Sequence, residues 1–538
     1  MTPQSSAVPN ASRRVVVIGG GVAGLATAAL LAADGADVTL LEARSELGGR
    51  AGSWESDGFR FDTGPSWYLM PEVFDHFFEL LGTTTAEQYE LVTLAPGYRA
   101  WFEGEGEAFD LPAAGRAARE AFAALDPGAA ARLDAYFDSA ASTYDIAVRK
   151  FLYSSYTSAA PFLDREALGS AGRMARLMSR SLDREIRSVS QDSRIRRLLG
   201  FPAVFLGGSP MQVPALYHLM SHLDVNQGVA YPLGGFERVV AAIARLAEVH
   251  GVEIRTNARV TRIDVVDGAA RGVIVDGGGD GEAPRRIPAD VVVSAADLHH
   301  TEQLLLAPEH RDHDAEWWSR RVAGPGAVLA MLGVRGELPQ LAHHTMLLAE
   351  DWEGGFSRIA ASRGKAGRPA TFPDTPSLYL GKPSATDPDV APAGDEALFM
   401  LIPVAPDTRL GHGGVARGGD PAVEAFVDRA IDQVAAWTGA PDLAERVVVR
   451  RTVAPGDFAD DLGAWSGSAL GPAHTLRQSA VFRASNASRR VRGLYFAGSS
   501  TIPGIGVPMC LISAELILKR LRGDESATPL AEPIGAFA

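Results

Sequence analysis

The start of the chain alternates between apolar runs and glycines. Val15 to Ile18 is a run of four β-branched residues that leads directly into three glycines, and small or apolar side chains fill Leu25 to Ala33. This order predicts a buried parallel strand, a tight turn and the beginning of a helix. A second apolar run at 37–41 predicts the neighbouring strand.

Similar patterns return much later in the chain. Residues 290–297 contain three consecutive valines. A strand this apolar is typically buried on both faces, so we expect it to join the first sheet. Residues 492–509 predict a strand, a glycine-rich loop and a helix start, with Pro508 in the first turn, where a missing N–H group costs nothing. The sequence therefore predicts one nucleotide-binding domain assembled from separate parts of the chain.

The pattern from 71 to about 197 is mostly helical, with apolar residues three and four positions apart. Within it, arginines at three- and four-residue steps lie opposite an apolar stripe, which predicts one amphipathic helix. The arginines are Arg173, Arg176, Arg180, Arg184 and Arg187. Such a helix either covers a packed core with a solvated charged face or lies on a membrane with its arginines at the lipid headgroups.

Composition excludes several classes of function. The chain has 538 residues and a formal net charge of −14, which disfavours a nucleic-acid partner because phosphates would be repelled. One cysteine, Cys510, leaves no pair for a disulfide, and the twelve histidines lack metal-ligand spacing, so we predict no metal site.

The N-terminal apolar stretch imitates two targeting signals. Val15 to Ala33 holds 19 uncharged residues, and Arg13-Arg14 precede it as in a twin-arginine export signal. The glycines at strand–turn–helix spacing explain the stretch better than a membrane span does. We therefore expect a cytoplasmic protein whose fold begins here, after a disordered tail from Met1 to Ser12.

The first glycine turn has the spacing of a dinucleotide site. Gly19 permits a sharp turn, Gly21 lets the backbone approach a diphosphate, and Gly24 allows close packing of helix on strand. The N–H groups and the dipole at the helix start favour negative charge. Glu42, at the end of the second strand, is placed to accept hydrogen bonds from ribose hydroxyls.

The segment after Glu42 indicates which dinucleotide binds. A second glycine pair followed by an arginine resembles flavoproteins of the glutathione-reductase and amine-oxidase type, which implies FAD. The expected cofactor-binding residues are Gly19, Gly21, Val22, Ala23, Gly24, Glu42, Ala43, Arg44, Gly48, Gly49, Arg50, Gly64, Pro65, Ser66, Val260, Gly498, Ser499, Gly506, Val507 and Pro508.

These patterns together predict an α/β fold: a discontinuous, Rossmann-like FAD-binding domain of the glutathione-reductase type, a mixed-sheet substrate domain and a helical, membrane-facing subdomain. The expected ranges are 13–70, 230–300 and 485–522 for the FAD-binding domain, 71–229 for the helical part of the substrate domain, 301–484 for the rest of that domain, and 523–538 for a disordered tail.

Several segments, spread from Arg14 to Arg522, resemble bacterial-type phytoene desaturases, the carotenoid desaturase family of the amine-oxidase-like superfamily. Beyond the first fingerprint, the specific segments are Leu341-Ala342-His343-His344-Thr345 and Pro503-Gly504-Ile505-Gly506-Val507-Pro508. The resemblance implies FAD-dependent insertion of double bonds into a phytoene-like polyene, with products towards lycopene. It also implies a peripheral enzyme at the inner face of the cell membrane, reoxidised by oxygen or a quinone.

In the expected mechanism, the flavin carries out the main chemical step. Since no side chain accepts a hydride, hydride transfer to the flavin and loss of a neighbouring proton form the expected mechanism, with Asp297 as the base and Asp145 and Arg149 as weaker candidates. His343 and His344 are expected in a loop, and Cys510 is expected to serve packing. An apolar substrate requires a channel of apolar side chains. Its candidate lining residues are Trp67, Tyr68, Phe201, Phe205 and Met211.

Other functions on the same scaffold remain open. A carotenoid isomerase or saturase would use the same cofactor, and isomerisation would consume no oxidant. A flavin amine oxidase is disfavoured because Gly498-Ser499 stands where a Gly-Glu pair is common in that group. A membrane-associated FAD-binding protein without turnover is the alternative from a different class.

Overall fold

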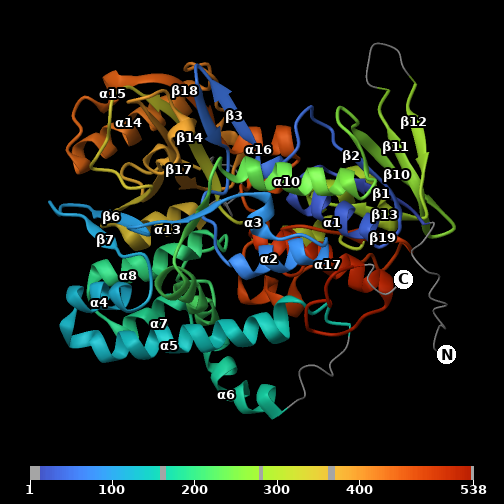
Figure 1. Ribbon diagram of the computed structural model, residues 1–538, viewed down its shortest axis with the longest axis horizontal. Helices are drawn as coiled ribbons and strands as arrows, with labels where there is room; N and C mark the ends of the chain where they lie inside the picture. The colour runs from blue at the N-terminus through green and yellow to red at the C-terminus, as the bar shows by residue number, and fades with distance from the viewer. Residues whose placement is uncertain (1–12, 158–164, 278–282, 361–369, 535–538) are drawn as a thin grey trace.

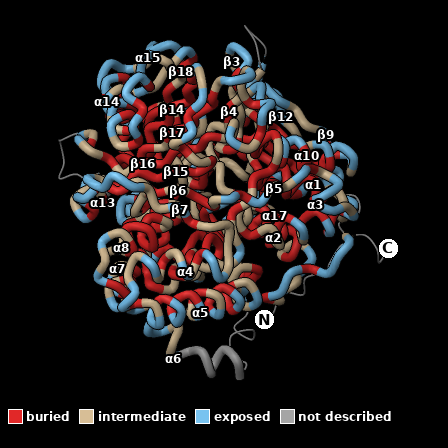
Figure 2. The backbone as a smooth tube through the Cα atoms, turned by 60° about the vertical axis from the view of Figure 1, so that its left-hand side comes forward, coloured by how far each residue is buried: buried red, intermediate tan, exposed pale blue. Residues whose placement is uncertain are grey.

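A computed structural model describes residues 13–157, 165–277, 283–360 and 370–534, so the expected N-terminal tail lies outside the described residues. Figure 1 shows three regions: a parallel sheet flanked by α1, α10 and α17, a mixed sheet with β14 and β17, and a group of helices that includes α4 to α8. Buried residues lie in all three regions, including the inner sides of α4, α5, α7 and α8 (Figure 2).

The parallel sheet confirms that the nucleotide-binding domain is discontinuous. Its strand order is β19-β13-β1-β2-β9. These strands are β1 (Arg14–Ile18), β2 (Asp37–Leu41), β9 (Glu253–Arg255), β13 (Val291–Ser294) and β19 (Leu494–Phe496). Val16 pairs with Val292, and Val293 pairs with Tyr495, so β13 lies between β1 and β19 and joins the two ends of the chain in one sheet.

Both faces of this sheet are covered. One face packs on α1 (Val22–Ala33), α10 (Phe236–Val249) and α17 (Val507–Arg522). The other face packs on an antiparallel sheet of β10 (Val260–Val266), β11 (Ala269–Val275) and β12 (Arg285–Pro288). This double coverage explains why the parallel strands are almost uniformly apolar.

The mixed sheet has the order β18-β14-β17-β16-β15-β6-β7. Its strands are β6 (Tyr98–Phe102), β7 (Phe109–Leu111), β14 (Gly326–Val334), β15 (His344–Leu348), β16 (Leu378–Gly381), β17 (Glu396–Val404) and β18 (Val447–Val453). One face packs on α14 (Pro421–Thr438). The segment from 71 to 197 is mostly helical, as predicted, but its strands β6 and β7 join the substrate sheet, which the sequence did not predict.

The remaining helices and strands connect these layers. The helices are α2 (Pro71–Leu80), α3 (Thr85–Gln88), α4 (Arg116–Leu125), α5 (Ala130–Ala147), α6 (Arg165–Ser179), α7 (Leu182–Val189), α8 (Ser193–Gly200), α9 (Met220–His222), α11 (Leu298–His300), α12 (Ala315–Ser319), α13 (Trp352–Ala360), α15 (Leu443–Arg446) and α16 (Pro455–Leu462). The short strands are β3 (Ser53–Ser56), β4 (Phe59–Asp62), β5 (Leu91–Thr93) and β8 (Ala230–Pro232).

The arginine stripe is divided between two helices, so the prediction of one amphipathic helix is wrong. Helix α6 ends at Ser179, and Ser181 caps a new helix, α7, by accepting a hydrogen bond from the Arg184 N–H group. Arg176 and Arg180 both form ion pairs with Glu185, at 3.1 and 2.9 Å.

The apolar side of the stripe is also used within the protein. Leu182, Ile186 and Val189 are buried in the core beneath the mixed sheet. This favours the packed-core interpretation of the stripe over a membrane-inserted helix.

The chain after α17 is folded against the protein as far as it is described, which corrects the prediction of a disordered tail from 523. The Lys519 ammonium donates to the Ser526 and Thr528 carbonyls at 2.8 and 2.7 Å. The Leu530 N–H donates to the Glu515 carboxylate at 2.6 Å. Because these polar contacts follow no periodic sequence pattern, the sequence did not predict them. Residues 535–538 lie outside the described part of the chain.

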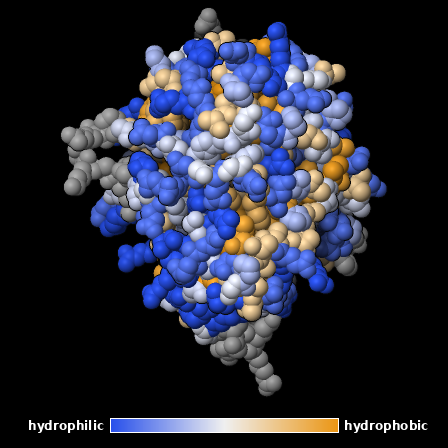
Figure 3. All heavy atoms as spheres, turned by 90° about the vertical axis from the view of Figure 1, so that its left-hand side faces the viewer, coloured by the Kyte–Doolittle hydropathy of each residue, from blue (hydrophilic) through white to orange (hydrophobic). Residues whose placement is uncertain are grey.

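The surface is mainly polar. Hydrophilic residues cover most of the face in Figure 3, and hydrophobic residues gather in patches between them. Among the described helices, none combines the length and the apolar character needed to span a bilayer.

Candidate active site

The first glycine turn is held by the acid that the sequence singled out. Gly19 has a φ of +101°, and a Cβ on Gly24 would lie 1.9 Å from the Gly19 carbonyl oxygen, so both positions require glycine. The buried Glu42 carboxylate accepts hydrogen bonds from the Gly20 N–H at 2.6 Å and from the Arg44 N–H at 2.8 Å. Glu42 therefore sets the shape of the turn, and its contact with a ribose stays a prediction.

The second glycine pair lies directly against the first turn. The Gly48 N–H donates to the Gly20 carbonyl at 2.8 Å, and Gly21 and Gly48 form a parallel bridge. A Cβ on Gly64 would lie 2.0 Å from the Arg50 carbonyl oxygen. Backbone from three glycine segments thus forms one wall without side chains, which suits the close approach of a dinucleotide.

Arg50 and Asp297 face each other on this wall. Nη2 of Arg50 lies 3.9 Å from Oδ2 of Asp297. Arg50 Nε and Nη2 and Asp297 Oδ2 are buried and have no hydrogen-bond partner among the described residues. Buried donors without partners are costly, so an unpaired guanidinium fits a bound anion such as a diphosphate. The residues present therefore fit FAD.

Asp297 also has a local structural role. Its Oδ1 caps α11 by accepting hydrogen bonds from the His299 and His300 N–H groups, at 2.9 and 3.5 Å. This position places Asp297 on the cofactor wall, and its role as a base stays a prediction. The weaker candidates, Asp145 and Arg149, form an exposed ion pair one helical turn apart.

The C-terminal glycine loop reaches the same site. A Cβ on Gly498 would lie 3.4 Å from the Ala23 Cβ, and Gly506 precedes the first turn of α17 with a φ of +125°. Burial raises the pKa of the Cys510 thiol to about 11, and the charge of Arg50 acts in the opposite direction. Helices α1 and α17 share one core. Both glycine turns therefore belong to one site.

Other expected cofactor-binding residues lie at the starts of α1 and α17 or in the adjoining core. Val22 and Ala23 begin α1, Val507 and Pro508 begin α17, and Val260 lies in the core that contains Leu41. Among the described residues, no group of three or more His, Cys, Asp or Glu side chains is arranged to hold a metal ion.

Three buried side chains that the sequence analysis missed hold the C-terminal loop in place. Arg483 donates to the Thr501 carbonyl at 3.0 Å, and Asn486 donates to the Ile502 carbonyl at 2.7 Å. His474 Nε2 accepts the Ile505 N–H at 3.2 Å. Burial keeps the pKa of His474 well below its usual value, so the imidazole stays neutral and able to accept.

Five aromatic side chains, which we call the aromatic box, lie beside residues 64–66, which are among the expected cofactor-binding residues. They are Trp67, Tyr98, Phe205, His344 and Tyr379. The rings of Trp67 and His344 stack with centroids 4.7 Å apart and an interplanar angle of 10°. The Tyr379 hydroxyl lies 2.8 Å from His344 Nδ1.

The aromatic box revises several expectations. His344 is the first residue of β15 and is fully buried, so its placement in a loop is wrong, whereas His343 lies just before the strand. Tyr68 belongs to the core of the nucleotide-binding domain, where its hydroxyl contacts that of Tyr89 at 2.9 Å. The other expected lining residues lie in or against the core that contains the box.

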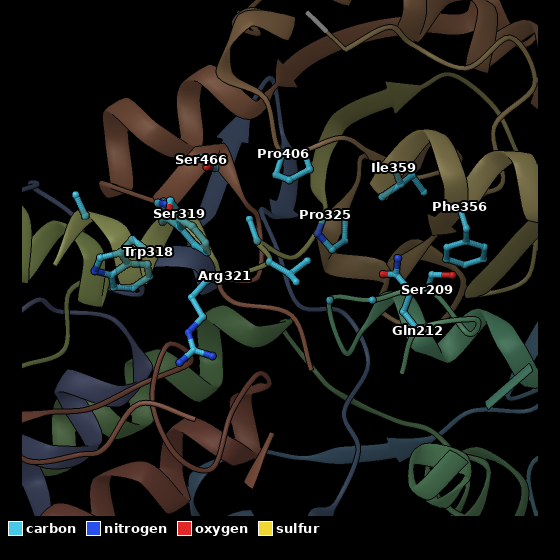
Figure 4. Close-up of a pocket in the computed structure, with 16 residues that line it drawn as sticks. Ser209, Gln212, Trp318, Ser319, Arg321, Pro325, Phe356, Ile359, Pro406 and Ser466 are labelled. Atoms are coloured by element: carbon cyan, nitrogen blue, oxygen red, sulfur yellow. The ribbon is translucent and has the colours of Figure 1, made fainter. Parts of the chain in front are cut away.

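Two cavities adjoin these elements. A pocket of about 350 Å³ is enclosed by Trp318 on one side and by Phe356 and Ile359 on the other (Figure 4). Gly207, in its wall, is so close to the C-terminal loop that a Cβ there would lie 2.9 Å from the Ile505 side chain. A second cavity of about 30 Å³ lies among Ser66, His343 and Tyr379.

Comparison with other proteins agrees with this geometry. The model of the family described as flavin containing amine oxidoreductase matches residues 22–516. A carotenoid 3,4-desaturase of Haloarcula japonica is 39% identical over 511 residues, covering 95% of this chain and 98% of that protein. A phytoene dehydrogenase of Streptomyces griseus is 33% identical over 534 residues, covering 97% and 98%.

Solved structures share the fold. An oxidoreductase of Methanosarcina mazei aligns with a TM-score of 0.58 at 17% identity, over 94% of this chain and 100% of that chain. A putrescine oxidase with bound putrescine aligns with a TM-score of 0.58 at 16% identity, over 95% and 98%. Similarity at this level of identity supports the architecture alone. The glycine wall, the family match and the near full-length relatives together show that the chain is an FAD-dependent oxidoreductase of the flavin-containing amine oxidoreductase family, in its carotenoid desaturase branch.

Proposed function

We propose that this enzyme desaturates a long polyene of the carotenoid type. The observation that carries the proposal is the aromatic box, in which Trp67 follows the expected cofactor-binding segment 64–66 and four further rings from distant elements pack around it. Burying a hydrocarbon in such surroundings contributes about 25 cal/mol per Å² of apolar surface, enough to bind a substrate that offers few hydrogen bonds. Relatives that are named as carotenoid or phytoene desaturases support the same activity.

The residues of the chain bind and orient the cofactor and the polyene. The glycine wall and Arg50 would hold the diphosphate of FAD, Glu42 would accept hydrogen bonds from the ribose hydroxyls, and the positive end of the α17 dipole would favour negative charge on the flavin. Bound FAD would supply the hydride acceptor that desaturation needs, and the proton lost from the neighbouring carbon would pass to a base, for which Asp297 is the candidate. The aromatic box excludes water and aligns the polyene with the cofactor.

The enzyme works at a membrane surface, where an insoluble polyene is available. Three large hydrophobic side chains are exposed on the segment 476–482, which we call the apolar loop: Leu476 at 41%, Val481 at 57% and Phe482 at 57%. The loop adjoins the 350 Å³ pocket, because the pocket residues Arg321 and Val322 are hydrogen-bonded to it at 3.0 and 2.7 Å. Substrate therefore enters from lipid beside the apolar loop.

The test of the activity uses purified, FAD-loaded enzyme with phytoene in liposomes, under air or with an added quinone. We expect a multi-peaked visible absorption spectrum that grows only when an acceptor is present. Equal product formation without an acceptor would indicate an isomerase. Failure with several carotenes under both conditions would contradict the proposal.

The test of membrane contact compares three positions of similar exposure. Phe482→Glu and Val481→Glu are expected to reduce flotation with anionic liposomes several-fold. Val415→Glu is the control, because Val415 is 55% exposed and lies outside the apolar loop. Equal flotation of all three variants and the wild type would exclude the loop as the contact surface.

A further inference from the structure

Arg483 is a buried cation that is surrounded by backbone carbonyls. Its guanidinium donates hydrogen bonds to the carbonyls of Gln478 at 3.1 Å, Pro472 at 3.1 Å, Thr501 at 3.0 Å and Ser499. In the part of the chain that the structure describes, no aspartate or glutamate forms an ion pair with it. Buried charges are normally paired, because their removal from water is costly, so this exception requires an explanation.

Two titratable side chains, Tyr217 and His474, interact with Arg483, and neither neutralises it. Burial lowers the pKa of Arg483 to about 10, so the guanidinium stays charged at neutral pH. Burial raises the pKa of Tyr217, whose hydroxyl donates to Ser479 Oγ at 3.0 Å. Burial also keeps the pKa of His474 well below its usual value, and the charge of Arg483 acts in the same direction. Since both side chains are neutral and carbonyls carry only partial charges, a net positive charge remains here.

This charge lies beside the candidate cofactor site. Ser499 and Thr501, which accept hydrogen bonds from Arg483, belong to the C-terminal glycine loop, and Ser499 is an expected cofactor-binding residue. The preceding residue, Gly498, is so close to the first glycine turn that a Cβ there would lie 3.4 Å from the Ala23 Cβ. The same loop leads into α17, whose N-terminal end carries the positive pole of the helix dipole. Arg483 therefore adds a full positive charge to a loop that already favours negative charge.

Holding the loop in place does not by itself require a cation. All four contacts are hydrogen bonds to carbonyl oxygens, which a neutral donor such as a glutamine amide also makes. A neutral donor would avoid the desolvation of a charge. The positive charge of Arg483 therefore indicates a second role.

We propose that Arg483 is an electrostatic positioning residue that holds the reduction potential of bound FAD above that of free FAD. A flavin ring that accepts a hydride gains a negative charge, and charged protein groups near the ring tune its potential. A buried cation stabilises this negative charge more strongly than an exposed one, because the dielectric constant around it is low. The potential is a property of the FAD-loaded protein, so it can be measured whatever the substrate is.

The test measures the midpoint potential of the FAD-loaded protein by anaerobic titration with dithionite and a reference dye. For the wild type, we expect a potential above that of free FAD under the same conditions. Arg483→Gln removes the charge and keeps an N–H donor. We expect its preference for reduced over oxidised FAD to fall about tenfold or more, which lowers the potential of this two-electron couple by about 30 mV.

Arg483→Lys separates the charge from the hydrogen bonds. This variant keeps a cation and loses the planar fork that reaches several carbonyls at once. Its potential should stay near that of the wild type, even where its affinity for FAD falls. Melting temperatures and the Kd for oxidised FAD, measured for every variant, report separately on folding and on how firmly the loop holds the cofactor.

Arg197→Gln is the matched control. Arg197 is buried to the same extent as Arg483, and it also donates to a backbone carbonyl, that of Leu348 at 3.0 Å. Leu348 belongs to β15 in the mixed sheet, away from the C-terminal glycine loop. Loss of this charge should leave the midpoint potential unchanged.

Four results would overturn the proposal. The first is a wild-type potential at or below that of free FAD, a measurement that decides the matter even if Arg483→Gln fails to fold. The second is an equal shift in Arg483→Gln and Arg483→Lys, which would assign the effect to the hydrogen bonds. The third is weaker FAD binding in Arg483→Gln at an unchanged potential, which would leave Arg483 as a clamp of the loop. The fourth is an equal shift in Arg197→Gln, since any buried cation would then act alike.

Discussion

Replacing Arg50 by methionine separates cofactor binding from folding. Two nitrogens of the Arg50 guanidinium are buried without a hydrogen-bond partner, and the nearest carboxylate oxygen, on Asp297, is 3.9 Å away. Without cofactor, this cation is a poorly compensated charge. With FAD, the same nitrogens are available to the diphosphate. The substitution Arg50→Met should therefore weaken FAD binding without unfolding the apoprotein.

The magnitude follows from the unpaired nitrogens. A hydrogen bond to a charged group contributes about 1.5–3 kcal/mol. Two such bonds at the lower value give about 3 kcal/mol, which corresponds to roughly a 100- to 200-fold increase in Kd. The unfolding free energy of the apoprotein should change by less than about 1 kcal/mol, because the side chain lost was not fully paired.

The assay titrates apoprotein with FAD by isothermal calorimetry and compares chemical denaturation of the two apoproteins. Arg262→Met is the control, because Arg262 is exposed on β10 and the substitution removes the same charge. It should bind FAD like the wild type. An unchanged Kd in Arg50→Met would refute the assignment of Arg50 to the diphosphate. A large loss of apoprotein stability would show that the side chain is structural instead.

Three further predictions concern the glycine turn, the cysteine and the C-terminal segment. Gly24→Ala places a Cβ 1.9 Å from the Gly19 carbonyl oxygen. We therefore expect the free energy of unfolding to fall by about 1–3 kcal/mol or more and FAD to be lost. An unchanged melting curve would contradict the tight turn. Burial raises the pKa of Cys510 to about 11, so the thiol is protonated at neutral pH and FAD should be released by acid precipitation from the wild type and from Cys510→Ser alike; yellow pellets would contradict this. Burial lowers the pKa of His76, but the carboxylates of Glu515 and Glu532 outweigh burial, so the net pKa is raised. The stabilisation of the fold by these ion pairs is therefore complete below about pH 6.5, the ordinary pKa of histidine, and is lost as pH rises through the raised pKa. Hydrogen exchange at 523–534, corrected for intrinsic rates, should therefore accelerate above that pH in the wild type and lose this dependence in His76→Gln.

The sequence predicts those parts of the fold whose signal is local. The strands of the parallel sheet are buried on both faces, so each is an apolar run that is visible without its neighbours. Strand β6 was missed because Arg99 and Trp101 alternate with Tyr98, Ala100 and Phe102, a two-residue period that is short and lies between helical segments.

The break between α6 and α7 was hidden for a different reason. The arginine spacing continues across Ser181 in nearly the same helical phase, although Ser181 caps a new helix. Periodicity reports which residues share a face, and it does not report whether the backbone between them is continuous.

In the candidate site, too, residues with a local sequence signal could be predicted, and residues brought together only by the fold could not. The glycine wall is encoded in a few short segments, so its residues were found. Trp67 and Phe205 were expected as lining residues, whereas His474, Arg483, Tyr98 and Tyr379 come from distant elements and are single residues without a pattern. Their proximity depends on how the mixed sheet is placed over the nucleotide-binding domain, and only the folded chain shows that.

The most direct test of the central claim is an anaerobic single turnover. FAD-loaded enzyme is mixed with a polyene in liposomes without oxygen or quinone, and the flavin and polyene absorption bands are recorded together. The account predicts that the flavin band bleaches while the polyene spectrum moves to longer wavelength, with one new double bond for each flavin reduced. A flavin that stays oxidised while the polyene changes, or a polyene that stays unchanged with every carotenoid tried, would contradict it.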